Sequence, residues 1–196
     1  MDSPKAFVEK IRREKFFIGA AEGKNPLAYD LDRALRQLSV DLYQHDFHFI
    51  KELIQNAEDN AYEENVCPSL EFKLIKKDIA GVGAKATLLI LNNERGLRPG
   101  DVTALCSVGK STKVGKRNQG YIGCKGLGFK SIFMVCESAI IFSDGYRIRF
   151  RQIASKEAGV GYIVPEWTES PSDGAILSAC GGSKLPKTLL IIPTTY

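Results

Sequence analysis

The sequence predicts an α+β protein, a two-layer α/β sandwich in which helices collect on one face of a mixed β-sheet. Apolar residues recur at helical spacing over residues 27–43 and 47–62. From residue 70 onward they instead alternate with polar residues or form short continuous runs, as strands do. Packing the helices on the sheet is the simplest way to bury both kinds of apolar surface.

Three helices are expected in the first part of the chain. Ser3 can cap a helix that begins at Pro4 and ends near residue 15. Its basic end suggests that residues 1–26 form a surface arm. The second helix covers residues 27–43, with an apolar side made by Leu27, Leu31, Ala34, Leu35, Leu38 and Leu42.

The third helix, residues 47–62 (FHFIKELIQNAEDNAY), follows a turn at residues 44–46 in which Asp46 is a suitable N-cap. At about 100° per residue, Glu52, Asn56 and Asp59 share one side of this helix. The opposite side is apolar and consists of Phe47, Ile50, Leu53, Ile54, Ala57 and Ala61. The polar side is either a solvated surface or a row of site residues, and periodicity alone leaves both open.

Strands and short helices complete the predicted sandwich. Pro99 opens a short helix through about residue 105, and residues 126–135 are expected to be helical. Asp144 and Gly145 form a hairpin turn between two strands. Residues 154–183 receive no assignment beyond a short strand at 162–164. The other expected strands are 70–76, 86–91, 139–143, 146–151 and 187–192.

Composition indicates an ordinary globular domain, expected to span residues 27–196. The 196 residues are 44% hydrophobic and 26% charged, and the net charge of +4 does not by itself indicate nucleic acid. The five cysteines form no CxxC pair, which favours free thiols in a reducing compartment. With no signal peptide and no apolar run of membrane length, we expect an intracellular protein, cytoplasmic or nuclear, without membrane contact.

Two neighbouring segments are rich in glycine and lysine. Residues 106–125 form a long basic loop, and residues 120–131 (GYIGCKGLGFKS) lead into the helix expected at 126–135. Glycines let a backbone approach a ligand closely, and amides at the start of a helix favour an anion. Phosphate is therefore the expected ligand, and a turn whose glycines serve only chain geometry is the alternative.

Two common phosphate-binding motifs are absent. A P-loop needs a glycine at position 104, where the chain has Ala104. The Rossmann fingerprint needs a third glycine where the chain has Ser131. A nucleic-acid module would rest on the basic loop alone, which lacks interleaved aromatic residues for base stacking, so nucleic acid is not an expected partner.

Taken in order, these motifs resemble the GHKL ATPases, the family of gyrase B, the ninety-kilodalton heat-shock chaperone, histidine kinases and MutL. Residues 52–59 (ELIQNAED) are similar to the family's N-box, and residues 123–129 (GCKGLGF) to its second glycine box. Residues 107–112 (SVGKST) resemble the start of the ATP lid in the chaperone branch. The amino-acid sequences of residues 92–96 (NNERG) and 128–133 (GFKSIF) are most similar to those of sacsin-like and plant No Vein-like proteins.

The resemblance, which spans about residues 27–193, implies a Bergerat ATP-binding fold, ATP and Mg²⁺ as cofactors, and a lid at about residues 106–125. It implies that Glu52 is the general base, that Asn56 binds Mg²⁺ and that Asp59 supports the adenosine end. Amides of Gly126, Leu127, Gly128 and Phe129 are implied to hold the phosphates, and Lys110 or Lys130 to neutralise their charge. Ser111 of the lid and Gly123 of the second glycine box are also implied to bind the nucleotide. Thr188, Asn92 and Gly96 are implied at the adenine end.

One part of the chain departs from the family pattern. The first glycine box is Asp-x-Gly-x-Gly in the family, whereas here Asn92 stands for the aspartate and Glu94 for a glycine. Asn92 can accept a hydrogen bond from adenine but is neutral and can also donate.

The expected function is therefore Mg-dependent ATP binding with slow hydrolysis to ADP and phosphate, acting as a conformational switch. The expected partners are ATP, a second copy in a nucleotide-dependent homodimer, and a protein whose identity the sequence does not give. The alternative is a degenerate, non-catalytic GHKL-like module that serves as a protein-interaction platform.

Overall fold

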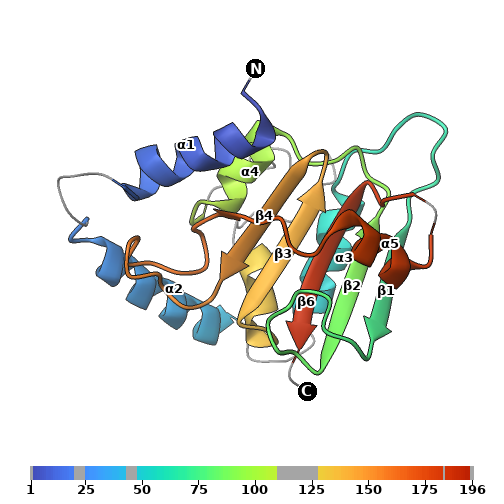
Figure 1. Cartoon of the computed structure of the whole chain (residues 1–196). Coiled ribbons are helices and arrows are strands. Elements are labelled where there is room, and N and C mark those ends of the chain that lie inside the picture. The colour runs from blue at the N-terminus through green and yellow to red at the C-terminus, as the bar shows by residue number, and fades with distance from the viewer. Residues whose placement is uncertain (1, 20–24, 43–47, 110–127, 183, 195–196) are drawn as a thin grey trace.

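A computed structural model describes residues 2–19, 25–42, 48–109, 128–182 and 184–194, with backbone only for 38–42. A six-stranded sheet forms its centre (Figure 1). No helix in the described ranges has the length and apolar character needed to cross a membrane. The strands, in their order across the sheet, are β1 (Leu70–Ile75), β2 (Ala86–Asn92), β6 (Thr188–Thr194), β3 (Ser138–Ser143), β4 (Tyr146–Arg151) and β5 (Glu166–Trp167).

The α+β class and the two-layer architecture are confirmed, but the sheet is antiparallel rather than mixed. Every pairing among the described strands is antiparallel. The last strand, β6, enters between β2 and β3 and runs opposite to both, so it joins the two hairpins β1–β2 and β3–β4 into one sheet. The predicted turn between β3 and β4 is present, with φ of 47° at Asp144 and 81° at Gly145.

Neighbouring residues in the central strands point to opposite faces of the sheet and enter two separate apolar clusters. On β2, Ile90 joins the larger cluster with the helices, whereas Leu89 joins a smaller one on the other face. The helix α5 (Asp173–Cys180) covers that other face and contributes Ile176 (Figure 1). The predicted burial of the 86–91 strand on both faces is confirmed. The described helices that precede α5 along the chain contribute to the larger cluster on one face, as predicted, and the short helix α5 is an addition on the other.

The first helix is part of the core, contrary to the expected surface arm. Helix α1 (Pro4–Phe16) begins as predicted, with the Ala6 N–H donating to Ser3 Oγ at 3.2 Å. Val8, Ile11 and Phe16 are buried in the larger cluster, and the helix packs on β4 and β5. The burial of α1 was missed in the sequence because the basic residues near the end of the helix were weighed and the apolar residues on its inner side were not.

Helix α2 (Ala28–Leu42) forms as predicted but turns a different side inward. Leu35 is buried, while Leu27, Leu31 and Ala34 are exposed. The buried neighbour of Leu35 is Asp32, whose carboxylate accepts from Gly161 N–H and Arg36 Nε, both at 2.8 Å. These bonds compensate the cost of burying a carboxylate, which an apolar pattern cannot anticipate.

Helix α3 (His48–Glu58) is shorter than predicted, so Ala61 lies beyond its end and is exposed. Leu53 and Ala57 are buried as expected, but Ile54 is exposed. Phe47, Asp46 and the turn at 44–46 lie outside the described residues. Helix α4 (Pro99–Leu105) matches its prediction, and η2 (Gly128–Met134) is a 3₁₀ helix. The strand expected at 162–164 is absent, and the short strand β5 follows it instead.

Candidate functional site

The polar side of α3 faces the beginning of η2. A Cβ placed on Gly128 would overlap Oε2 of Glu52 and lie 3.2 Å from its Cδ. Only glycine fits at position 128 while Glu52 keeps this position. Helix α3 packs along η2, so the N-box-like helix lies beside Gly128 and Phe129, the described end of the glycine-box-like segment, although about seventy residues separate them in the chain.

Glu52, Asn56 and Asp59 are all half-buried, so their side of α3 is not a fully solvated surface. Asn56 lies one turn after Glu52. Asp59 follows the last residue of the helix, and its N–H donates to Gln55 O at 3.0 Å. The three residues keep the order in which the sequence places them, and their roles remain predictions.

The donor set around α3 suits Mg²⁺ that arrives with a phosphate ligand better than a resident metal ion. No group of three His, Cys, Asp or Glu that could hold a metal occurs among the described residues. Asn56 supplies one amide oxygen, and Mg²⁺ in nucleotide sites keeps water and phosphate oxygens as most of its ligands. The amide oxygen of Asn56 is of the kind that Mg²⁺ binds, and the role of Asn56 as a Mg²⁺ ligand stays a prediction.

The residues expected near adenine gather at one end of the sheet. Asn92 and Thr188 are directly paired in register across β2 and β6. The Thr188 hydroxyl lies 2.7 Å from Ser143 Oγ on β3, which also accepts from the Leu97 N–H at 2.9 Å. Three neighbouring strands thus bring small polar side chains to this end.

Gly96 has a structural reason to be glycine. Its φ is +100°, and an added Cβ would lie 2.8 Å from Cβ of Asp144. The tight approach of this loop to the β3–β4 turn requires glycine whether or not a nucleotide binds.

Asn92 is buried, and its amide oxygen already has partners. Oδ1 accepts from the Glu94 N–H at 3.2 Å and lies 3.1 Å from the Tyr62 hydroxyl. That hydroxyl also lies 2.6 Å from Ala57 O, so its single proton is shared between the two acceptors. Because the Glu94 N–H can only donate, it fixes the oxygen of Asn92 on that side. Burial raises the pKa of Tyr62, which the bond to Asn92 partly opposes.

Lys130 is turned away from the predicted phosphate role. It is buried, and its Nζ donates to Leu105 O at 2.9 Å. Lys15 from α1 donates to Cys106 O and to Ser107 Oγ, both at 2.6 Å. Two ammonium groups therefore bind the carbonyl end of α4, where the helix dipole favours positive charge. Burial lowers the pKa of Lys130 to about 8.

This lysine pair was missed in the sequence because its partners are far apart along the chain. Lys15 and Cys106 are 91 positions apart, and no motif or period links them. Phe129 also points into the core, where its ring packs edge-on against Phe150 with centroids 5.5 Å apart. Only the backbone of Phe129 can then serve a phosphate. The predicted residues Lys110, Ser111, Gly123, Gly126 and Leu127 lie outside the described residues.

Comparison with known proteins gives one family and one relative. Residues 29–150 match the model of the sacsin domain. The chain is also 41% identical over 170 residues to the protein NO VEIN of Arabidopsis thaliana. That alignment covers 84% of this chain but 6% of the plant protein, so the chain corresponds to a small part of its relative.

Proposed function

Because this chain belongs to the sacsin domain family, we propose that it is a GHKL-type domain that binds Mg-ATP and hydrolyses it slowly. The observation that carries the proposal is the packing of Glu52 against Gly128. A carboxylate beside the backbone of Gly128 offers a base for the attacking water next to amides that can bind the phosphates. Nucleotide binding then acts as a switch between two conformations.

Each residue has a defined task in this proposal. Glu52 orients a water molecule and accepts its proton while the water oxygen attacks the terminal phosphorus and ADP leaves. Asn56 directs its amide oxygen to Mg²⁺, which supplies charge neutralisation at the phosphates. Backbone amides near Gly128 bind phosphate oxygens. Of the two lysines expected to neutralise the phosphate charge, Lys130 donates to Leu105 O, so the proposal gives this task to Lys110.

The adenine end is formed by Asn92 and Thr188, which are paired across β2 and β6. Thr188 shares a hydrogen bond with Ser143, so the hydroxyl pair offers both a donor and an acceptor to a bridging water. Asp59, at the end of α3, supports the adenosine side. Binding would tie α3, η2 and the three central strands together, which is how a small ligand can change the conformation of a whole domain.

Titration calorimetry with ATP and Mg²⁺, together with a steady-state phosphate-release assay, tests the proposal. Glu52→Ala should retain binding and lower hydrolysis by about a hundredfold, the low end for loss of a general base. Glu58→Ala is the matched control, because Glu58 is an exposed glutamate on the same helix. Absence of binding at millimolar ATP would reject the proposal.

A second function, a non-catalytic module that serves as an interaction platform, is favoured by one observation. Asn92 replaces the family's aspartate, and its oxygen is engaged by the Glu94 N–H. Glu94 is also buried, at a position where the GHKL ATPases have glycine. Both residues that differ from the GHKL pattern, Asn92 and Glu94, are therefore buried in the fold. A wild-type protein that binds no ATP, or binds it without any turnover, identifies this second function.

A further inference from the structure

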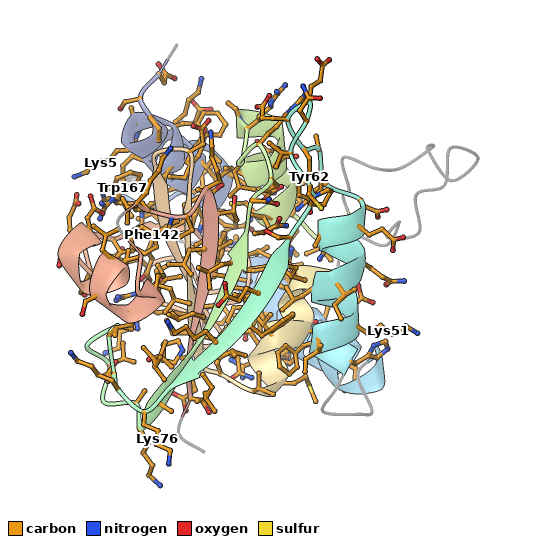
Figure 2. The ribbon with its side chains drawn as sticks, turned by 90° about the vertical axis from the view of Figure 1, so that its right-hand side faces the viewer. Lys5, Lys51, Tyr62, Lys76, Phe142 and Trp167 are labelled. Atoms are coloured by element: carbon orange, nitrogen blue, oxygen red, sulfur yellow. The ribbon has the colours of Figure 1, made fainter. Side chains whose placement is uncertain are left out.

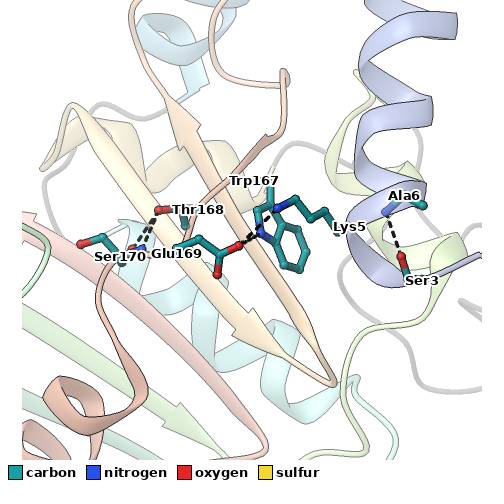
Figure 3. A network of polar contacts seen from close by, with 7 residues as sticks. All are labelled: Ser3, Lys5, Ala6, Trp167, Thr168, Glu169 and Ser170. Carbon is teal, nitrogen blue, oxygen red and sulfur yellow. Dashed lines mark hydrogen bonds and ion pairs between the residues drawn. The ribbon is translucent and has the colours of Figure 1, made fainter.

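The two edges of the sheet differ in how they are protected. On the β5 edge, α1 covers the strand, and Lys5 lies 5.8 Å from the ring centroid of Trp167 (Figure 3). Glu169 joins them, accepting from Trp167 Nε1 at 2.7 Å and from Lys5 at 3.4 Å. The other edge is β1, and no described strand pairs with its outer side. Figure 2 views the molecule from this side.

Strand β1 also exposes large apolar side chains. Phe72 is 37% exposed and Leu74 is 64% exposed. Both lie on the α3 side of the sheet, because their cross-strand partners Ile90 and Leu88 pack in the larger cluster. An open strand edge with exposed apolar residues is a template for pairing with another strand.

We propose that β1 pairs antiparallel with β1 of a second copy of this chain, about a twofold axis at Phe72. The two six-stranded sheets then continue into one, with the helical layers of both copies on the same side. The dimer needs no nucleotide, so it is independent of the proposed ATPase activity and of the nucleotide-dependent dimer expected from the family resemblance.

The sequence of β1 (LEFKLI) is complementary to itself in this one register. With the axis at Phe72, Glu71 lies opposite Lys73 twice on the α5 face. On the α3 face, Leu70 lies opposite Leu74 twice and Phe72 lies opposite Phe72. Moving the axis by one residue places Glu71 opposite Glu71 or Lys73 opposite Lys73, and both arrangements repel. Charge therefore selects a second copy and fixes how it pairs.

Lys73 can make this contact without losing its present one. Its Nζ donates to Cys180 O of α5 at 3.0 Å, and an ammonium group has three donors. Glu71 is exposed and lies on the α5 face of the sheet, like Lys73, because the two residues are two positions apart along one strand. In the dimer, Glu71 of one copy thus forms an ion pair with Lys73 of the other, close to the end of α5.

Charge exchange tests the register. Sedimentation equilibrium without nucleotide should show a wild-type dimer. Glu71→Lys or Lys73→Glu should raise its dissociation constant about tenfold, because each change turns two attractive pairs into repulsive ones. The double variant Glu71→Lys/Lys73→Glu should restore wild-type affinity, since the exchanged charges are again complementary.

Phe72→Lys places two lysines on the axis and should abolish dimerisation. Leu185→Lys is the matched control, because Leu185 is 38% exposed but lies outside the sheet. Circular dichroism checks that each variant folds, and if Phe72→Lys does not, the charge-exchange set decides alone. A monomeric wild type, a double variant as weak as the single ones, or equal loss in the control overturns the proposal.

Discussion

Asn92 connects three parts of the molecule through one buried amide. It ends β2, it accepts from Glu94 in the following loop, and it lies beside the hydroxyl of Tyr62 after α3. Its cross-strand partner is Thr188. A change at this residue therefore probes the adenine end of the proposed site directly.

Asn92→Asp should tighten ATP binding by about tenfold. A carboxylate keeps both present donors, Glu94 N–H and Tyr62 OH, and its second oxygen can accept from the adenine amine in a charge-assisted bond. Calorimetry with ATP and GTP measures this, because guanine presents a carbonyl in place of the amine and should gain nothing. Asn93→Asp is the control, since Asn93 binds Ser69 and Cys67 instead. Equal gains for both nucleotides would refute the contact.

At the scale of elements, α1 is an integral part of the larger apolar cluster. Val8 is fully buried and touches the same cluster as the strands β3 and β4. Val8→Ala should lower the free energy of unfolding by about 2 kcal/mol, from two lost methyl groups and the cavity they leave. Val66→Ala, at an exposed valine in a loop, should change it little. Urea unfolding compares the two, and equal effects would mean that α1 is a detachable arm.

The elements also show what local pattern can and cannot reveal. Strands β1 to β4 and helix α4 were predicted within a residue or two because alternation, turn residues and Pro99 act over a few positions. The buried side of α2 was not, because Asp32 is held inside by Gly161, more than a hundred residues away. Likewise, β6 between β2 and β3, and α5 on the second face, are results of tertiary packing.

At the scale of the whole molecule, several residues that the sequence groups at one site lie close together, whereas the positions of the lysines around them did not follow from the sequence. The roles of the grouped residues stay predictions. Glu52 and Gly128 meet, and Asn92 pairs with Thr188, because the motif order reflects a chain path that this fold follows. The lysines could not be assigned from sequence, since a lysine in a glycine-rich motif can serve a ligand or a carbonyl. Lys130 serves a carbonyl, and the consequence reaches the stability of the entire domain.

That consequence is a maximum in stability near pH 9. Burial lowers the pKa of Lys130 from 10.5 to about 8, so between these values the unfolded chain binds a proton that the folded chain does not. Stability therefore rises from pH 8. Burial raises the pKa of Cys106 and of Cys136 from 9.0 to about 12, so above pH 9 the folded chain holds two protons that the unfolded chain releases. Above pH 9 the folded chain therefore binds more protons than the unfolded chain, because two thiols count against one lysine, and stability falls as the pH rises.

Urea unfolding at pH values from 7 to 10.5 should show this maximum as a shallow one. Lys130 contributes a gain of about 1 kcal/mol between pH 8 and 9, and the two thiols offset most of it over the same range. Lys130→Met removes the titrating group and should abolish the rise while leaving the fall above pH 9. Lys156→Met, at an exposed lysine in the loop after β4, should keep the wild-type profile. A rise that persists in Lys130→Met would assign the linkage to another group and would mean that Lys130 keeps an ordinary pKa in the folded domain.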